Sequence, residues 1–491
     1  MTERNRHGRV VVVGGGISGL AAAYTLARAR QAGTPIEESL IEARERLGGV
    51  IRTERVEGFV IEAGPDSFLA EKPEAAALAR ELGLGDSLLG SNDSERRTYI
   101  LHRGRLVPLP DGLMLLVPTR LWPMVTTSLV PLSSKLAMAA EWFTSPPGER
   151  QPADESVASF VTRHFGAAML DNIADPLLAG VYGGDSGSLS VRSVLPRFWE
   201  MERKHGSLTR ATLQAMRRRR ETLSNGSEVG IGTRPAGTGA LPLFMTLKEG
   251  LEQLTTQLIR RLEASRIALG RRVLSVEPAA AGGRGFVVRC EGGTAHEAGA
   301  VVLAMPTHEA RRLLAPLNPA LATLLGEIPY SSSMTVSLGY DAGTVAQLPR
   351  GFGFLVPRKE KRRMLACTFV HGKFKHRSPE GKALLRCFLG GSRDPEVLGL
   401  SDDEVVERVR QEIREILGLS AEPLFYRVHR WPSSMAQYVV GHAERVKAIQ
   451  AEVGKLPGLF LAGNAFSGIG ISDCIRTGRM AAEGAIALLR N

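Results

Sequence analysis

The stretch that decides the fold runs from Val10 to Ala23 and reads VVVVGGGISGLAAA. Its four β-branched residues predict a short buried strand, and the Ala-rich run that follows predicts a helix. The glycines between them have the spacing G-x-G-x-x-G. Gly14 permits a tight turn, Gly16 lets the backbone approach a pyrophosphate, and Gly19 lets helix and strand pack closely. Because the start of a helix offers free N–H groups to phosphates, the stretch predicts a dinucleotide site. The alternative is a structural strand–turn–helix corner without a ligand.

An acidic residue at the end of the next strand supports the dinucleotide interpretation. We expect this strand at residues 39–43, with Glu42 placed to accept hydrogen bonds from ribose hydroxyls. Glu42 lies further from Gly14 than the usual ~20 residues, and the polar turn at residues 31–35 can absorb the extra length. The residues predicted for this part of the site are Gly14, Gly15, Gly16, Ile17, Ser18, Gly19, Glu42 and Ala43.

A second glycine loop makes the prediction more specific. Glu42 is followed by the R-x-G-G pattern Arg46–Gly49, whose adjacent glycines can bring backbone amides to a second part of a long cofactor. A nicotinamide enzyme has no need of this loop, whereas FAD lies extended across its domain, so the pattern favours FAD. Residues 64–67 then border the flavin ring or form an ordinary β-turn. These segments add to the predicted cofactor site Arg44, Leu47, Gly48, Gly49, Gly64, Pro65, Asp66 and Ser67.

Later segments are predicted to return to the same domain. Strands are expected at residues 272–276, 285–289 and 299–304, and Val273 could lie against the adenine or in any strand core. A C-terminal strand at 458–464 precedes a helix at 474–489, whose N-terminus can direct its dipole at the flavin N1–C2=O edge. These segments contribute Val273, Gly463, Asn464, Gly470, Ile471 and Ser472 to the predicted cofactor site.

Composition narrows the class of protein and of partner. A chain of 491 residues exceeds one ordinary core, so two or three domains are expected, and 43% apolar and 23% charged residues indicate a globular protein. The net charge of +11 favours an anionic partner. Nucleic acid is discounted because the one dense basic block, residues 217–220, carries no interleaved aromatics. The four scattered cysteines fit reduced thiols in the cytoplasm, and neither a secretory signal nor a spanning helix is predicted.

The middle of the chain differs in character from its ends. Residues 106–142 are apolar but broken by five prolines, which suits a helical lobe that covers a cleft or touches a bilayer surface, or a plain buried helical core. Residues 330–430 alternate strands with one helix near 402–417 and predict a sheet-based substrate domain. We therefore expect a mixed α/β fold, α+β overall. Its expected segments are 1–84 (FAD-binding), 85–234 (helical lobe), 235–308 (FAD-binding), 309–430 (substrate-binding sheet) and 431–491 (FAD-binding).

Taken together, these motifs resemble the FAD-dependent amine-oxidase superfamily, and within it the oxygen-dependent protoporphyrinogen and coproporphyrinogen III oxidases. The superfamily resemblance rests on residues 13–20, 42–49 and 461–464. The matches to the porphyrinogen oxidases are Gly64–Leu69, Pro176–Asp185, Leu365–Thr368, His371–Phe374, Arg430–Pro432, Gln437–Tyr438 and Gly470–Ile475. Oxidases of amines and desaturases of carotenoids share the glycine motifs but not these.

The resemblance implies a set of substrate residues. In one branch of the family an arginine before a strand holds a propionate, and Arg97 is the nearest match, with Arg96 as the alternative. In the other branch a lysine after the G-P-D-S motif faces the propionates, and Lys72 stands there. Gly180 matches a glycine beside the porphyrinogen, Thr368 lies in a matched motif, and Trp431 matches an aromatic near the flavin. Which porphyrinogen is preferred is left open.

The resemblance also implies the reaction. Six electrons leave the porphyrinogen in three cycles of non-covalently bound FAD, each closed by O₂ with release of H₂O₂. The sequence predicts no catalytic acid, base or metal site. Peripheral membrane contact, at the inner face of the cell membrane, and a homodimer are both left open. The competing hypotheses are an amine oxidase or carotenoid-type desaturase, and a non-catalytic flavin-binding sensor. Turnover of porphyrinogens under air distinguishes them.

Overall fold

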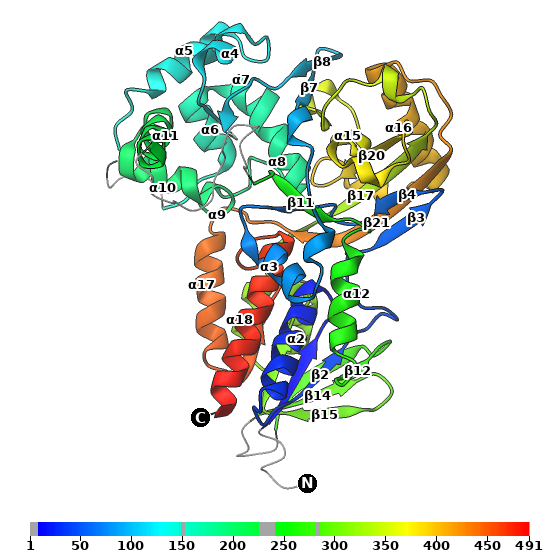
Figure 1. The fold of residues 1–491 in the computed structure, drawn as a ribbon. Helices are drawn as coiled ribbons and strands as arrows, with labels where there is room; N and C mark the ends of the chain where they lie inside the picture. Colours follow the sequence, from blue (N-terminus) through cyan, green and yellow to red (C-terminus); the bar gives the residue numbers. More distant parts are fainter. Residues whose placement is uncertain are drawn as a thin grey trace.

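The computed structural model describes residues 8–114, 116–146, 148, 153–224, 241–279 and 285–490. The fold is mixed α/β, as the sequence predicts. Figure 1 shows an elongated lower region built around a sheet and long helices, with a helical lobe and a second sheet side by side above it. Both ends of the described chain lie at the bottom of the lower region.

The lower region is organised by a five-stranded parallel sheet in the order β12-β2-β1-β16-β22. The buried residues 10–13 pair with 300–303 on one side and with 38–41 on the other. The sheet thus takes its strands from three distant parts of the sequence. Strand β2 begins before the predicted start and ends before Glu42, which follows the strand. The strands are β1 (Arg9–Val13), β2 (Glu37–Ile41), β12 (Arg266–Ala268), β16 (Ala300–Leu303) and β22 (Leu459–Leu461).

Two long helices pack together on this sheet. Helix α2 (Ile17–Gln31) follows the first glycine loop, and α18 (Ile471–Arg490) ends the chain. They approach so closely that a Cβ added to Gly478 would lie 2.1 Å from the Ser18 carbonyl oxygen. Helix α18 begins three residues before its predicted start. The neighbouring helices are α3 (Pro73–Glu81), α12 (Glu252–Arg261), α13 (Thr307–Leu314), α14 (Pro319–Gly326) and α17 (His442–Val453).

The second sheet has seven strands in the order β21-β17-β20-β19-β18-β7-β8. Its helix α16 (Asp402–Leu417) has the predicted bounds, with a capping box formed by Ser401 and Glu404. Strands β7 and β8 come from a segment expected to be helical. The strands are β7 (Thr98–His102), β8 (Arg105–Pro108), β17 (Tyr330–Tyr340), β18 (Gly353–Leu355), β19 (Ala366–Phe369), β20 (Ala383–Gly390) and β21 (Phe425–Ala436), and the short α15 (Val370–Lys373) follows β19.

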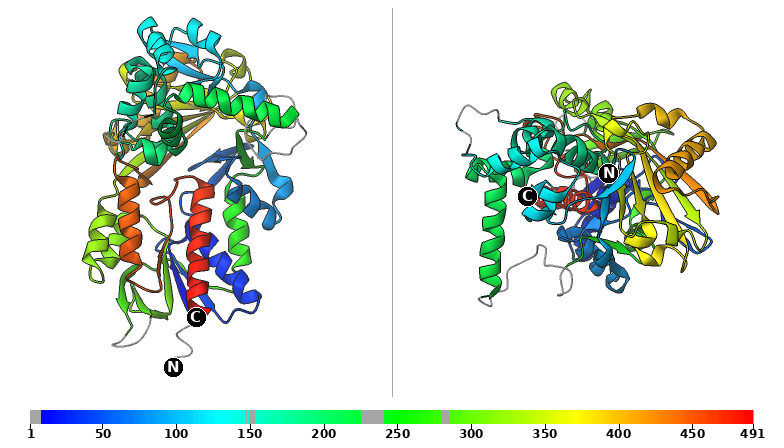
Figure 2. Two further views of the ribbon diagram at one scale, coloured as in Figure 1. Left: turned by 90° about the vertical axis from the view of Figure 1, so that its left-hand side faces the viewer. Right: turned by 90° about the horizontal axis from the view of Figure 1, so that it is seen from above.

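The helical lobe holds most of the described residues between 121 and 224, and its last helix projects from the body of the molecule (Figure 2). The expected boundary at 234/235 lies outside the described residues. The helices are α4 (Leu121–Thr126), α5 (Leu132–Glu141), α6 (Val157–Phe165), α7 (Ala167–Met169), α8 (Asp175–Tyr182), α9 (Val191–Val194), α10 (Pro196–His205) and α11 (Leu208–Ser224), with a π-helical turn at Leu170–Ala174.

Short sheets connect these parts. Their strands are β3 (Thr53–Val56) with β4 (Phe59–Glu62), β5 (Phe68–Leu69) with β11 (Phe244–Leu247) and β6 (Leu88–Gly90), β9 (Leu113–Met114) with β10 (Val117–Pro118), and β13 (Val273–Pro278) with β14 (Phe286–Cys290) and β15 (Ala295–Ala298).

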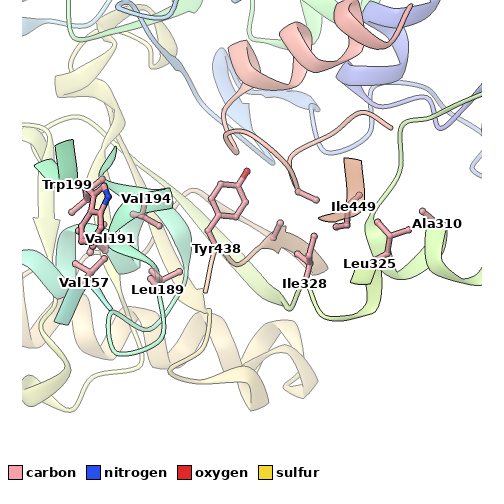
Figure 3. Packing of buried hydrophobic residues seen from close by; sticks show 14 of the residues in the cluster. Val157, Leu189, Val191, Val194, Trp199, Ala310, Leu325, Ile328, Tyr438 and Ile449 are labelled. Carbon is pink, nitrogen blue, oxygen red and sulfur yellow. The ribbon is translucent and has the colours of Figure 1, made fainter. Parts of the chain in front are cut away.

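One hydrophobic core joins the helical lobe to the lower region. Figure 3 shows Tyr438 between two groups of buried residues that belong to the same cluster. The lobe contributes Val157, Leu189, Val191, Val194 and Trp199, and the lower region contributes Ala310, Leu325, Ile328 and Ile449. Because apolar contacts are continuous across the junction, the lobe is held against the lower region by hydrophobic burial.

Candidate active site

The first glycine loop has the geometry that its spacing predicts. Gly14 has φ +106°, and a Cβ there would lie 2.3 Å from the Ala304 carbonyl oxygen. A Cβ at Gly19 would lie 1.8 Å from the Gly14 carbonyl oxygen. At Gly16, in contrast, a Cβ would meet no described atom within 4 Å, and this residue precedes α2 without a side-chain cap. The outer glycines are therefore required by packing, while the middle one faces open space in front of a helix N-terminus.

Glu42 lies directly beside this loop. Its Oε2 accepts a hydrogen bond from Gly15 N at 2.6 Å, and its Oε1 accepts one from Arg44 N at 2.9 Å. The second loop is tied to the first, since Gly48 N donates to the Gly15 carbonyl oxygen at 2.8 Å. Ile17, Ser18, Leu47 and Gly48 are buried, whereas Ala43 and Arg44 are exposed. The structure therefore brings the two predicted glycine loops and the acidic residue to one place.

Arg46 holds the second loop and was not among the predicted site residues. Its guanidinium donates hydrogen bonds to the carbonyl oxygens of Leu47 and Gly49. Gly48 and Gly49 both have positive φ, at +101° and +59°. Burial lowers the pKa of Arg46 from its ordinary value. The arginine of the R-x-G-G pattern thus stabilises the loop conformation through hydrogen bonds to carbonyl oxygens of the loop itself.

Val273 lies at the same end of the sheet. The connection before it is bonded to the acidic segment, because Arg271 N donates to the Glu42 carbonyl oxygen and Gly270 N donates to that of Arg44, both at 3.0 Å. Val273 itself is buried at the start of β13. It belongs to the three-stranded sheet β13-β14-β15, so it reaches this place from outside the five-stranded sheet.

The segment 64–67 is held by side chains from the second sheet and its connections. Trp431 Nε1 donates to the Ala63 carbonyl oxygen at 2.8 Å, and Arg386 donates to that of Gly64. Arg377 donates to the Asp66 carbonyl oxygen at 2.8 Å. Lys373 Nζ lies 3.1 Å from both Asp66 Oδ2 and Ser67 Oγ. The segment, which includes Pro65, is therefore held in place by the second sheet and its connections, and we call it the junction.

The cations beneath this junction keep Asp66 ionised. Burial alone would raise the pKa of the Asp66 carboxyl, but Lys373, Arg386 and Arg377 hold that pKa well below its usual range. Burial lowers the pKa of Lys373, against the attraction of Asp66. Glu62 is paired with Arg377 at 3.0 Å, and burial raises the pKa of Glu62. Three cations thus face two carboxylates in this buried cluster.

The C-terminal segment is bonded to the end of β21 and to the start of α3. Gly463 has φ +134° and donates its N–H to Thr477, while Asn464 Nδ2 donates to the Ser434 carbonyl oxygen. Tyr438 Oη donates to the Asn464 carbonyl oxygen at 2.7 Å. Helix α18 then starts at Ile471, after Gly470. Its Ser472 hydroxyl donates to the Lys72 carbonyl oxygen and accepts from Ala75 N, so this hydroxyl is engaged with α3.

The predicted substrate residues fall into two places. Arg97 is exposed, and its carbonyl oxygen accepts from Phe352 N next to β18. Thr368 lies on β19, where it pairs with Gly353 of β18. Gly180 is exposed on α8, and a Cβ there would lie 3.3 Å from Leu355 of β18. These three therefore lie around one strand.

Lys72, which directly precedes α3, has its side chain beside the start of α18 instead. Its Nζ is 2.6 Å from Asp473 Oδ2, so this lysine already has a carboxylate partner. Tyr182, at the end of α8, lies close enough to Asp473 that burial and this carboxylate together raise the pKa of Tyr182 to about 12. The end of α8 and the start of α18 therefore face each other.

A sequence profile of the flavin-containing amine oxidoreductases matches residues 17–486. The chain belongs to this family. The chain is also 33% identical over its whole length to the whole coproporphyrinogen III oxidase of Bacillus subtilis strain 168. It is 30% identical to the chloroplastic protoporphyrinogen oxidase of Nicotiana tabacum, over 95% of this chain and 83% of that protein. A crystal structure named provisionally as a protoporphyrinogen oxidase of Exiguobacterium sp. 255-15 superposes with a TM-score of 0.83, at 31% identity and 98% coverage of both chains.

The residues of the site fit FAD, the cofactor that membership of this flavin-containing family implies. The open space at Gly16 stands before the uncapped N-terminus of α2, where backbone N–H groups favour phosphate. The Glu42 carboxylate is oriented by two backbone N–H groups next to that space. The start of α18 lies against α2 and directs a second helix N-terminus to the same region. The two helix N-termini and the oriented Glu42 carboxylate therefore lie in one region, where a dinucleotide could contact all three.

The sequence alone does not predict the buried cations that hold the segment 62–67. Lys373, Arg377 and Arg386 lie more than 300 positions from the residues they hold at the 62–67 segment. No spacing pattern relates groups so far apart. One of these cations, Lys373, lies in the motif His371–Phe374, which supports the family resemblance but does not by itself predict a contact with Asp66.

Proposed function

We propose that this flavin-dependent oxidoreductase converts a porphyrinogen to a porphyrin with O₂ as the electron acceptor, and that its substrate is coproporphyrinogen III, protoporphyrinogen IX or both. The observation that carries the proposal is the end-to-end match to the Bacillus subtilis coproporphyrinogen III oxidase. That match includes the second sheet and the helical lobe as well as the dinucleotide region. In the proposed division of the chain, segments 1–84, 235–308 and 431–491 bind FAD, 85–234 forms the lobe, and 309–430 carries the substrate sheet.

In the proposed reaction, FAD supplies two-electron chemistry by accepting a hydride and passing the electrons to O₂. The protein binds and orients. The loops at Gly14–Gly19 and Arg46–Gly49 would hold the pyrophosphate and ribityl parts, Glu42 the ribose, and α18 the flavin edge. Asp66 is ionised and its carboxylate is already contacted by Lys373 and Ser67, so in the proposed reaction it would accept from a pyrrole N–H group only as an additional donor.

Substrate carboxylates need cations that are not already neutralised. Lys72 is paired with Asp473 at 2.6 Å, whereas the Arg97 side chain is exposed beside β18. We therefore favour Arg97 as the propionate partner. The net charge of +11 agrees with a polycarboxylate substrate, since it raises the local concentration of anions.

The helical lobe is proposed to touch a membrane surface. Large apolar side chains are exposed on α4, on α5 and directly after α5, among them Trp122 at 75% and Phe143 at 81% exposure. This surface, which we call the lobe tip, consists of Trp122, Val125, Leu132, Leu136, Trp142 and Phe143. Exposed aromatic and aliphatic side chains gathered in this way are typical of surfaces that insert into the headgroup region of a bilayer.

The proposed function is tested with purified, FAD-loaded protein under air. We expect porphyrin fluorescence and H₂O₂ to appear together from coproporphyrinogen III or protoporphyrinogen IX, and kcat/KM for the two to identify the preferred one. The absence of both products with both substrates contradicts the proposal, and turnover of amines instead would support an amine oxidase.

The propionate assignment has a matched control in the adjacent residue. Arg97→Ala should raise KM for the carboxylated substrate about tenfold, because one ion pair with a partly desolvated carboxylate is lost. Arg96→Ala, which removes an equally exposed arginine one position earlier, should leave KM within about twofold. Equal effects of the two variants, or an effect confined to Arg96, would reject the assignment to Arg97.

A further inference from the structure

Helix α8 occupies an unusual position in the lobe. It follows directly from the π-helical turn Leu170–Ala174, and π-turns within helices are frequent at functional sites. Its outer face presents Gly180 and Val181 (57% exposed) to solvent, and Gly180 borders Leu355 of β18. The helix therefore packs against β18 close to the three predicted substrate residues, and we refer to these two contacting elements, α8 and β18, as the two walls.

The first residue of α8 is fixed to the second sheet by a buried ion pair. Arg393 donates to Asp175 Oδ2 at 2.6 Å, and both side chains are at most 10% exposed. The other oxygen of Asp175 accepts from the Ser186 hydroxyl at 2.8 Å. Arg393 also donates to the Val356 carbonyl oxygen at 2.8 Å, directly after β18. One guanidinium thus bonds both walls at once.

The end of α8 is fixed to the loop 390–393, which carries Arg393, and to Gln437. Ser392 N donates to the Gly183 carbonyl oxygen at 2.8 Å, and Gln437 Nε2 donates to that of Tyr182 at 2.8 Å. A Cβ at Gly391 would lie 2.7 Å from the Gly183 carbonyl oxygen, so the two chains are in contact. The loop 390–393 therefore holds both ends of an eight-residue helix.

A buried ion pair is a costly way to stabilise a fold, because apolar residues of similar volume often do as well or better. The pair Asp175–Arg393 instead fixes the position of α8 relative to β18, because the planar guanidinium bonds one acceptor on α8 and one directly after β18 in a fixed geometry. Other ionic contacts of this region, such as Arg358 with Asp185, are half exposed and lack that constraint.

We infer that Arg393 is a positioning residue that sets the separation of α8 and β18, and through it the discrimination between porphyrinogens that differ in their side chains. The inference rests on the proposed function. Coproporphyrinogen carries two more propionates than protoporphyrinogen, so a change in wall separation alters the two rates unequally. Arg393 itself touches Asp175 and Val356, and acts on the substrate only through them.

The test compares Arg393→Met and Arg393→Lys with the control Arg363→Met. Arg363 pairs at 3.0 Å with Asp394, the next residue of the same loop, and not with either wall. The measured quantity is kcat/KM for coproporphyrinogen III divided by that for protoporphyrinogen IX. We expect Arg393→Met to change this ratio about tenfold, Arg393→Lys about threefold, and Arg363→Met less than twofold, because small displacements near the reacting atoms strongly affect rate.

Hydrogen–deuterium exchange provides a readout that does not depend on turnover. We expect amides of residues 175–183 to exchange faster in both Arg393 variants than in Arg363→Met. An unchanged ratio in an active enzyme, or unchanged exchange, overturns the inference. A wild-type protein that oxidises neither porphyrinogen contradicts the proposed function instead, and the exchange data still decide whether Arg393 holds α8 in position. If Arg393→Met does not fold, Arg393→Lys retains the charge and decides alone.

Discussion

The three glycines of the first loop have different tasks, and the atoms around each show which. Gly14 and Gly19 are in contact with backbone oxygens, at distances that leave no room for a methyl group. Gly16 has free space on the side where the cofactor is expected. The sequence spacing predicts all three positions, but only the structure separates packing from binding.

A pair of alanine variants tests this division. Gly16→Ala should leave the melting temperature of the cofactor-free protein nearly unchanged and weaken FAD binding about tenfold or more, because the methyl group enters the space for the pyrophosphate. Gly19→Ala should destabilise the fold itself by about 1–3 kcal/mol or more, because its methyl group overlaps the Gly14 carbonyl oxygen. Thermal melting and titration with FAD measure the two effects. Equal loss of stability in both variants would contradict the division.

The buried cations mark the limit of what single residues reveal in sequence. Glu42 and the R-x-G-G loop were found because each lies a few positions from a glycine motif. In the sequence, nothing distinguishes three basic residues, Lys373, Arg377 and Arg386, from others. In the folded protein they lie beside the carboxylates of Asp66 and Glu62. Cys367 and Cys387 are similar: they are 20 positions apart, yet lie opposite each other on β19 and β20, both free and buried.

Among the helices, the lobe contains a second buried charge cluster, centred on His164. Its Nε2 lies 3.0 Å from Glu202 of α10 and its Nδ1 lies 3.4 Å from Glu141 of α5. Arg163 of α6 also pairs with Glu202. Burial alone would lower the pKa of His164, but its hydrogen bonds to Glu141 and Glu202 raise this pKa above its ordinary value. Burial alone would raise the pKa of Glu202, but His164 and Arg163 lower the pKa of Glu202 to about 2. An imidazole between two carboxylates donates from both nitrogens and is therefore charged.

His164→Gln should destabilise the lobe in a pH-dependent way. A histidine whose folded pKa is raised stabilises the fold fully below its unfolded pKa of about 6.5, and this stabilisation is lost as pH rises through the folded pKa. The difference in melting temperature between wild type and His164→Gln should therefore be larger near pH 6 than near pH 9.

Glu141 and Glu202 set the lower limit of the pH range in which the His164 cluster stabilises the fold. Because the folded pKa values of Glu141 and Glu202 are lowered, their contribution is lost only as pH falls toward those values. Thr162→Ala, at an exposed position of α6 without an ionisable side chain, is the control and should show no such trend. A constant difference for His164→Gln across the pH range would show that the histidine is neutral in the fold.

Elements were predicted best where local signals agree. Helix α16 has the predicted bounds because a capping box and an apolar face of helical period coincide. The segment 98–108 was expected in the helical lobe, yet β7 pairs with β18 some 250 positions later. A strand that completes a distant sheet has no neighbour in sequence to reveal it.

For the molecule as a whole, the lobe tip lies at the opposite end from both termini of the described chain (Figure 1). Across the described residues, no helix combines the length and apolar character that crossing a bilayer needs. In the proposed membrane contact, the lobe tip would touch the bilayer from one side. The lower region would then extend away from the surface.

Vesicle flotation tests the lobe tip. We expect wild-type protein to float with phosphatidylglycerol vesicles and the double variant Trp122→Ser/Phe143→Ser to bind about tenfold less, since two large apolar side chains no longer leave water. Met480→Ser removes a 58%-exposed apolar side chain from α18, far from the tip, and serves as the control. Wild-type protein that stays at the bottom of the gradient contradicts membrane contact, and equal binding of all three proteins assigns it to another surface.

The composition of the five-stranded sheet has a consequence for synthesis. Strand β1 emerges from the ribosome first, but its neighbour β16 is made near residue 300 and the edge strand β22 near residue 460. At about 5–20 residues per second, translating all 491 residues takes roughly 25–100 s. For most of that time the valine strand has no partner on one side, and helix α18 does not yet exist. Uptake of FAD is therefore expected to follow synthesis of α18, and nascent chains should depend on chaperones until then.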